Sequence, residues 1–123
     1  MRLYLSSERL GERAGALLAI LSGKRVAVIA NGYDHRDAMA REIYRAEIYD
    51  PMAEFRALGL EPRELDLRAY FGDPQSLKAR LRTFDLVWVM GGNSFILRRA
   101  MRASGFDRVI RGLLEAGAVA YGG

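Results

Sequence analysis

The sequence from residue 85 to residue 94 reads DLVWVMGGNS. After Asp85 come five apolar residues without alternation, a pattern typical of a strand that is covered on both faces of a parallel sheet. Asp85 to Met90 is therefore predicted to be a buried strand, with Trp88 in the core. Gly91 to Ser94 predicts a sharp turn from this strand into a helix, because glycine permits backbone conformations that other residues avoid.

Similar units surround this stretch on both sides. Residues 24–30 form another apolar strand pattern, and helical patterns with apolar residues three and four positions apart separate the strands. Strands that alternate with helices of this length favour a parallel sheet with helices on both faces, a doubly wound α/β fold. The predicted strands are 2–6, 24–30, 64–67, 85–90 and 118–121, and the predicted helices are about 8–21, 34–46, 51–58, 74–84, 95–102 and 106–116.

Small polar residues, prolines and glycines mark the expected ends of the helices. Ser6 and Ser7 are candidate N-caps of the first helix, and Asp34 lies near the start of the second. Asp-Pro pairs at 50–51 and 73–74 are typical of an N-cap followed by a proline in the first turn. Gly23 and Gly117 are predicted to end the helices that precede them.

The composition indicates one intracellular domain. The chain has 123 residues, of which half are hydrophobic and none is cysteine, so it has neither disulfides nor thiolate metal sites. The longest apolar run, residues 14–21, is far shorter than the roughly 20 residues that a membrane span requires, and the first 21 residues are too charged for a signal peptide. We therefore expect a cytoplasmic protein without a membrane partner.

The basic charge is spread over the surface and does not predict a nucleic-acid partner. The formal net charge is +4, and six of the 17 arginines are directly adjacent to a carboxylate in the sequence. The densest basic group runs from Arg98 to Arg111 and contains a single aromatic residue, Phe106, rather than the series of interleaved aromatic residues that stack on bases. Arg98, Arg99 and Arg102 are expected to follow the glycine turn on a helix, where they either favour acidic substrates or form a solvated face.

Candidate functional residues lie in loops that follow strands, because ligands of open parallel sheets bind at the carboxyl ends of the strands. These loops are 6–7, 31–34, 91–94 and 122–123. In the third loop, the Gly91 and Gly92 amide groups could bind an anion or a developing oxyanion. An equally good interpretation is a tight turn with Asn93 as the helix N-cap. The loop lacks the phosphate-binding and dinucleotide-binding glycine motifs.

Other polar residues are weaker candidates. His35 is the sole histidine, and a histidine among charged neighbours at a helix start is more often solvated than catalytic. Asp34 and Asp37 could bind a cation, although helix capping explains them as well. Tyr44 and Tyr49 are expected to pack against the core rather than to contact a substrate. No metal site is predicted.

Residues 87–95 (VWVMGGNSF) and 117–123 (GAVAYGG) together resemble the dipeptidase E (α-aspartyl dipeptidase) family of serine peptidases. The resemblance implies a flavodoxin-like fold related to class I glutamine amidotransferases. In that family an apolar strand ends in G-G-N-[TS]-F, and a later strand ends in Y-x-G-x-S-A-G, whose serine is the nucleophile. The resemblance extends over the chain as a single α/β domain, 1–123, which would be incomplete: the amino-terminal half to two-thirds of a peptidase E-like domain.

The resemblance assigns roles to six residues of the chain. Gly91 and Gly92 would be the oxyanion-hole donors, and the substrate-binding residues would be Asn93, Ser94, Gly122 and Gly123. The nucleophilic serine would fall about two positions beyond Gly123, and the catalytic histidine later still. The intact relative would hydrolyse short peptides, including those with an amino-terminal Asp, without a metal or an organic cofactor, whereas this chain alone is expected to be inactive.

Two further hypotheses remain at this point, and whether the chain itself is an enzyme stays open. One is a non-catalytic α/β binding or assembly module on a glutamine amidotransferase-like scaffold, and the other is phosphate or nucleotide binding at the Gly91-Gly92 turn. A doubly wound sheet that stops after strand 118–121 would also lack the helix over that strand and the strands beyond it. Its open apolar faces predict self-association, or partial disorder of that strand.

Overall fold

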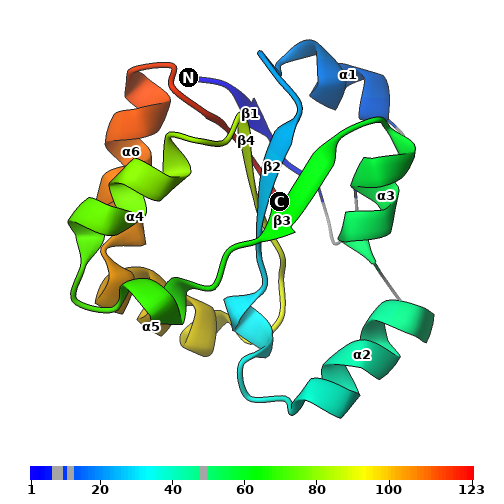
Figure 1. The fold of residues 1–123 in the computed structure, drawn as a ribbon, viewed down its shortest axis with the longest axis vertical. Coiled ribbons are helices and arrows are strands. Elements are labelled where there is room, and N and C mark those ends of the chain that lie inside the picture. Colours follow the sequence, from blue (N-terminus) through cyan, green and yellow to red (C-terminus); the bar gives the residue numbers. More distant parts are fainter. Residues whose placement is uncertain (7–9, 11–12, 48–49) are drawn as a thin grey trace.

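The computed structural model describes residues 1–6, 10, 13–47 and 50–123. It contains a five-stranded, all-parallel sheet in the order β1-β5-β4-β2-β3, with helices on both faces, so the predicted doubly wound α/β class is confirmed (Figure 1). The strands are β1 Leu3–Tyr4, β2 Arg25–Ile29, β3 Glu61–Glu64, β4 Leu86–Val89 and β5 Ala120–Gly122. The α-helices are α1 Ala14–Ala19, α2 Ala38–Glu47, α3 Pro51–Ala57, α4 Pro74–Leu81, α5 Ser94–Ser104 and α6 Phe106–Glu115, and the short 3-10 helices are η1 Asn31–Tyr33 and η2 Leu67–Tyr70.

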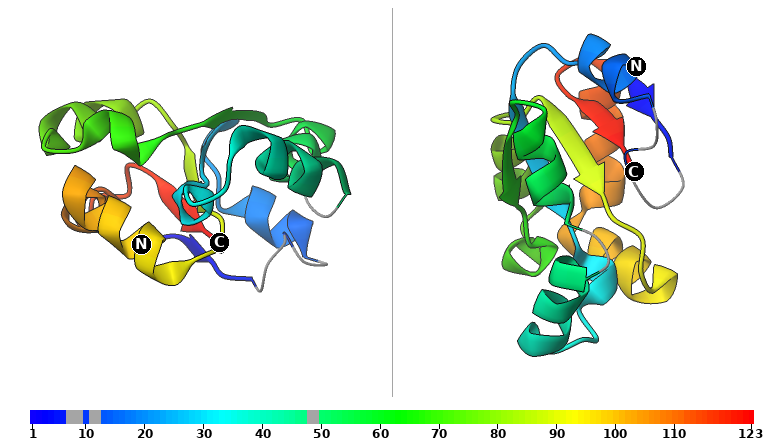
Figure 2. Two further views of the ribbon diagram at one scale, coloured as in Figure 1. Left: turned by 90° about the horizontal axis from the view of Figure 1, so that it is seen from below. Right: turned by 90° about the vertical axis from the view of Figure 1, so that its right-hand side faces the viewer.

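The two central strands divide the core into two halves, one on each face of the sheet (Figure 2). Val26, Val28, Leu86 and Trp88 pack with Leu17 of α1 and Phe55 of α3 on one face. The intervening residues of β2 and β4 pack with α4, α5 and α6 on the other face, in a cluster that includes Ala27, Ile29, Val87, Val89, Leu77, Leu81, Phe106 and Leu113. Trp88 is buried in the first half, as the sequence predicts. Among the described residues, no helix is both long and apolar enough to cross a membrane.

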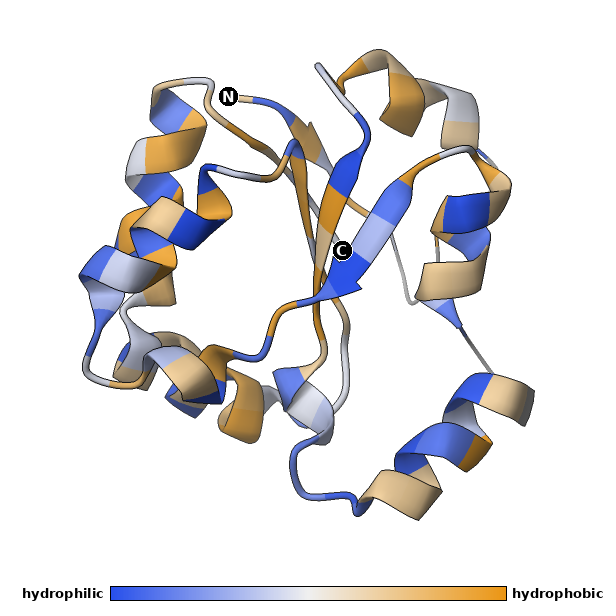
Figure 3. Cartoon of the chain, in the orientation of Figure 1, coloured by the Kyte–Doolittle hydropathy of each residue, from blue (hydrophilic) through white to orange (hydrophobic). Residues whose placement is uncertain are grey.

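The third strand lies earlier in the sequence than predicted. The expectation was 64–67, whereas β3 spans Glu61–Glu64 and contains Pro62. Proline is tolerated because β3 is at the edge of the sheet and pairs only with β2. Figure 3 shows β3 largely in the colours of polar residues, in contrast to the apolar central strands. The apolar residues that suggested the later position, Leu65 and Leu67, are buried in the core after the strand has ended.

The first helix is shorter than predicted, and its expected caps were wrong where the structure describes them. α1 follows Arg13, which makes no side-chain capping bond, and ends before Ile20. The Ser6 amide donates to the Gly123 carbonyl instead, and Ser7 lies outside the described residues. Gly23 does not cap α1, since it lies beyond the end of the helix; a Cβ atom there would be 2.4 Å from Asp85 Oδ2. A side chain at this position would displace the Asp85 carboxylate, which accepts a 3.0 Å hydrogen bond from the Arg25 amide.

The second helix forms but begins later than predicted, at Ala38 rather than near Asp34, and much of its apolar surface is exposed. The Asp37 carboxylate, rather than that of Asp34, caps its first turn, because Oδ1 accepts a 2.7 Å hydrogen bond from the Ala40 amide. Met39 and Ile43 are 74% and 51% exposed, which reflects the position of α2 at the periphery of the molecule (Figure 1). In contrast, α3 and α4 have the predicted Asp N-caps, Asp50 and Asp73, each of which accepts a backbone hydrogen bond.

The strand near the carboxyl end lies inside the sheet. β5 pairs with β4 on one side and with β1 on the other, so it is not an edge strand of the described sheet; the expected lack of a covering helix and of strands that follow 118–121 in the sequence stays a prediction. Ala120 and Gly122 are buried, and burial raises the pKa of the Tyr121 phenol. The sheet edge on this side is β1, where Leu3 and Leu5 are exposed. Self-association therefore stays a prediction, with β1 rather than β5 as the exposed edge.

Candidate functional site

The path of the chain reverses between β2 and β4, which are neighbours in the sheet. From β2 the chain moves outward to β3, and it then returns to β4 on the opposite side of β2. The crevice outside the carboxyl ends of such strands is the usual ligand site of open α/β sheets. The segment η1 follows β2 and the 90–93 segment follows β4, so these two segments define the candidate site.

The two segments touch through their backbones. The Asn93 amide donates a 2.9 Å hydrogen bond to the Gly32 carbonyl. A Cβ atom on Gly32 would lie 2.3 Å from the Gly91 oxygen, and one on Gly92 would lie 2.8 Å from the Gly32 oxygen. Gly92 also has φ of +100°, which favours glycine. The chain therefore needs glycine on both sides of this contact.

The glycine turn leaves two amide groups available. Asn93 is the N-cap of α5, and its Oδ1 accepts hydrogen bonds from the Phe95 and Ile96 amides at 3.0 and 3.1 Å. Within the described part of the chain, neither the Gly91 amide nor the Gly92 amide has a hydrogen-bond partner, and both residues are exposed, as is Ser94. The sequence-derived N-cap is thus present, while the amides of both glycines remain open to a ligand.

Gly122 and Gly123 lie at the same edge of the sheet, beside the end of β4. The Gly123 amide donates to the Tyr4 carbonyl at 3.2 Å, and a Cβ atom on Gly123 would lie 2.3 Å from the Val89 oxygen. A Cβ atom on Gly122 would lie 2.8 Å from the Trp88 ring. Both glycines therefore serve close packing of β5 against β4, and they bring the end of β5 next to the strand that leads into the glycine turn.

A buried asparagine that the sequence analysis did not single out holds η1 in place. The Asn31 side chain is 2% exposed; its Nδ2 donates to Asp34 Oδ2 at 2.8 Å and to Asp66 Oδ1 at 2.9 Å. Its Oδ1 accepts a 3.0 Å hydrogen bond from the Leu67 amide. Asn31 therefore ties η1, and with it Gly32, to the segment that follows β3. In the sequence, Asn31 belongs to the candidate loop 31–34, but nothing in its neighbours indicates the contacts with Asp66 and Leu67.

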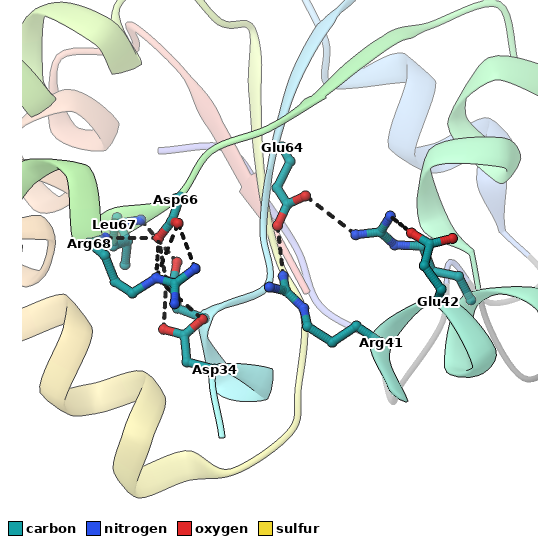
Figure 4. Close-up of polar contacts among 9 residues, drawn as sticks. Asp34, Arg41, Glu42, Glu64, Asp66, Leu67 and Arg68 are labelled. Atoms are coloured by element: carbon teal, nitrogen blue, oxygen red, sulfur yellow. Dashed lines mark hydrogen bonds and ion pairs between the residues drawn. The ribbon is translucent and has the colours of Figure 1, made fainter. Parts of the chain in front are cut away.

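An arginine completes this network from the solvent side (Figure 4). Arg68 pairs with Asp66, with 2.8 Å between Nη2 and Oδ2, and its Nε lies 3.8 Å from Asp34 Oδ1. Hydrogen bonds from Arg68, and secondarily from Asn31, lower the pKa of Asp66 to about 2. Hydrogen bonding to Asp66 correspondingly raises the pKa of Arg68. Asp66 is thus a charged structural partner at neutral pH rather than a proton-transfer group.

The remaining sequence candidates are not assembled into a site. His35 is exposed; the Asp34 carboxylate contacts Asn31, whereas that of Asp37 caps α2. No group of three or more His, Cys, Asp or Glu side chains that could hold a metal ion occurs among the residues described. Tyr44 is half-buried with its ring centroid 5.2 Å from that of Tyr33, and Tyr49 lies outside the described residues.

The basic residues of α5 form an exposed face. Arg98, Arg99 and Arg102 are all exposed, and they lie beyond the glycine turn along the helix, as the sequence analysis expected. The charge pairs of the structure join residues farther apart than immediate sequence neighbours, such as Arg41 with Glu64 and Arg25 with Asp85. The surface arginines are therefore balanced partly through tertiary contacts rather than through the adjacent carboxylates.

Fold and site together define a doubly wound α/β protein with a glycine turn at its switch point. Residues 37–123 match Peptidase family S51, and the chain belongs to this family. The structure is similar to the 1.5 Å crystal structure of a protein assigned as a peptidase E from Listeria monocytogenes EGD-e, with a TM-score of 0.74 and 24% sequence identity. The similarity covers 98% of this chain and 56% of that chain, so the present chain spans little more than half the length of that protein. No curated protein matches the sequence. The sequence resemblance to the peptidase E family is thus confirmed.

Proposed function

We propose that this chain provides the oxyanion-binding part of a serine peptidase site that acts on short peptides, including those with an amino-terminal Asp. The observation that supports this most directly is the pair of exposed amides at Gly91 and Gly92, which have no hydrogen-bond partner among the described residues. Membership of Peptidase family S51 supplies the reaction class. In this proposal, residues 1–123 correspond to the amino-terminal half to two-thirds of a peptidase E-like domain in the cytoplasm.

The chemistry of peptide hydrolysis explains why such amides are needed. Attack of a serine hydroxyl on the peptide carbonyl places negative charge on the carbonyl oxygen. Two backbone donors in fixed positions stabilise that charge without having to reorganise, and here the contact with Gly32 fixes the turn that bears them. Glycine also has no side chain to keep the substrate carbonyl away from the amides.

Asn93 and Ser94 are proposed to contact the substrate next to the glycine turn. Because Asn93 Oδ1 is used in capping α5, the Nδ2 group remains, and within the described part of the chain it has no partner. It could donate to a peptide carbonyl. Gly122 and Gly123 are proposed to guide the substrate at the end of β5, where the family pattern leads into the nucleophile turn.

Hydrolysis by residues 1–123 alone is not part of the proposal, because the family pattern matches neither a nucleophilic serine nor a catalytic histidine within them. An assay of the purified chain on short peptides is therefore expected to show no turnover. Turnover that a serine-reactive phosphonate abolishes would contradict this expectation. Self-association is proposed to accompany the fold, through the exposed apolar side chains at the β1 edge.

Binding tests the proposal without requiring turnover. In nitrogen-15-labelled protein, titration with an Asp-Leu dipeptide is expected to shift the Gly91 and Gly92 amide signals most, and to leave those of Gly72 and Gly117 unchanged. The variant Asn93→Asp keeps an oxygen for the helix cap but removes the Nδ2 donor, so it should bind the dipeptide more weakly. Gln75→Glu makes the same change of charge at an exposed site on α4 and serves as the control. Shifts confined to other residues would refute the assignment.

A further inference from the structure

A pocket lies on the other side of the same switch point, between α2, α3 and the ends of β2 and β4. Val28 and Met90 form its apolar floor with Met52 of α3. The hollow is small and partly open to solvent, with a cavity volume of about 30 Å³. Ligand sites in proteins are commonly apolar hollows with a few polar groups at one side, and they favour this position in α/β sheets.

The Arg36 guanidinium group lies at this pocket. Arg36 is exposed and lies over two aromatic rings, 5.3 Å from the centroid of Tyr33 and 5.4 Å from that of Tyr44. Among the described residues, no carboxylate forms an ion pair with it. The two rings position the guanidinium group, while its hydrogen-bonding edge stays available to an anion.

The other charges of the lining already have partners (Figure 4). Glu64 accepts from Arg41 Nη2 at 2.8 Å and from Arg45 Nη2 at 3.4 Å, and Arg45 also pairs with Glu42 at 2.9 Å. Among the described residues, the lining contains three arginines and one carboxylate, Glu64; because Glu42 also pairs with Arg45, the positive charge that is left over is that of Arg36. The surplus positive charge favours an anionic ligand, and Arg36, which forms no ion pair with the carboxylates that the structure describes, is the group to which that anion can bind.

We infer that this pocket binds a small carboxylate that carries an apolar body. The carboxylate pairs with Arg36, whose planar guanidinium group matches the two oxygens of a carboxylate. The apolar body lies on Val28, Met52 and Met90, and its burial contributes free energy in proportion to the apolar area removed from water. This inference goes beyond the proposed peptidase role, because it requires neither the Gly91 nor the Gly92 amide.

Calorimetric titration with phenylacetate and with its neutral analogue phenylacetamide tests the inference. The protein is expected to bind phenylacetate about tenfold more tightly than the amide, since one charge-assisted pair is worth a factor of that order. Arg36→Gln should lose about that factor for phenylacetate and leave phenylacetamide binding unchanged. Arg98→Gln removes an exposed arginine on α5 and should leave both affinities unchanged. Equal binding of the two compounds, no binding of either, or an unaltered Arg36→Gln variant would overturn the inference.

Methyl signals locate the bound ligand. Phenylacetate is expected to shift the methyl signals of Val28, Met52 and Met90, whereas Leu3 and Leu5 at the β1 edge should not respond. Asn93→Asp, designed to weaken dipeptide binding at the glycine turn, should bind phenylacetate normally, so the two proposals can fail independently. Shifts that centre on the arginines of α5 would refute the pocket as the site.

Discussion

The two sides of the switch point are built in opposite ways. Toward α5, backbone meets backbone: the Asn93 amide donates to the Gly32 carbonyl, and Gly92 leaves no room for a side chain. Toward α2, long side chains enclose a hollow, and Arg36 lies exposed over Tyr33 and Tyr44. Direct backbone packing fixes hydrogen-bond donors in place, whereas flexible side chains around a hollow can adapt to a ligand.

The two sides differ in rigidity, and this difference suits each of them to a different kind of ligand site. An oxyanion site must be rigid before the reaction begins, because donors that reorganise lose part of the stabilisation that they offer. The Gly32–Gly92 contact and the buried Asn31 meet that requirement. A pocket for a small carboxylate needs surplus charge and apolar surface, which the α2 side supplies with fewer fixed contacts.

The largest loss of stability is expected from Gly92→Ala, which disrupts the backbone contact between Gly32 and the glycine turn. The added methyl group meets the Gly32 oxygen and forces alanine into a positive φ, so the free energy of unfolding should fall by about 3 kcal/mol. Gly72→Ala shares the positive φ but meets no atom within 4 Å, and it should cost about 1 kcal/mol. Urea denaturation measures both. Equal losses would show that the Gly32 contact contributes nothing beyond the backbone conformation.

A smaller loss of stability is expected when the Asp66–Arg68 pair, which supports the segment that holds Asn31 and Gly32, is removed. The pKa of Asp66 is about 2 in the folded protein, below its usual value near 3.9 when unfolded. Its charge therefore stabilises the fold above about pH 4, and this stabilisation is lost as the pH falls toward 2. Because the pair is partly solvated, Asp66→Asn should cost less than about 1 kcal/mol at neutral pH.

The measurement for this prediction is urea denaturation at a series of pH values. The difference between the natural protein and Asp66→Asn should shrink as the pH falls from 5 to about 2, since protonated Asp66 loses the same charge. Asp107→Asn, at an exposed carboxylate on α6, provides the control for a change of one surface charge. A difference that stays constant over this range would exclude the Asp66 charge as its source.

The smallest change in stability is expected from a substitution on the exposed surface of α2. Met39 is 74% exposed, so Met39→Ser should change the free energy of unfolding by no more than about 0.5 kcal/mol. Met101→Ser, at a half-buried methionine of α5 that packs against the core, is the matched comparison and should be clearly more destabilising. Thermal unfolding of both variants measures this difference in stability. A large loss for Met39→Ser would indicate that α2 is covered in solution, for example by self-association.

Much of the fold could be predicted because its signals are local. The apolar runs of β2 and β4, the Asp N-caps of α3 and α4, and the apolar stripe of α6 each depend on residues that are close in sequence. β3 was misplaced because a charged edge strand with Pro62 has no apolar pattern, while the buried Leu65 and Leu67 follow it. The first helix was predicted to be longer than α1, because apolar residues at helical spacing continue beyond the residues that form the helix.

The candidate site likewise contains features that depend on neighbouring residues and features that depend on distant contacts. The glycine turn and its Asn93 cap could be predicted from GGN after an apolar strand. Asn31 could not, because its role depends on Asp66 and Leu67, which are 35 and 36 residues away in the sequence. The pocket at Arg36 could not be predicted either, since its lining comes from two strands and several helical segments.

By itself, the sequence determined the α/β class, the family resemblance, and the positions of the glycine turn and most helix caps, since each of these depends on neighbouring residues or on a contiguous motif. Only the tertiary structure decided that β5 lies between β1 and β4, that Gly32 requires Gly92 to lack a side chain, and that Arg36 has no carboxylate partner among the described residues. These features depend on which distant segments meet, and the side-chain periodicity of an individual segment carries no information about its neighbours in space.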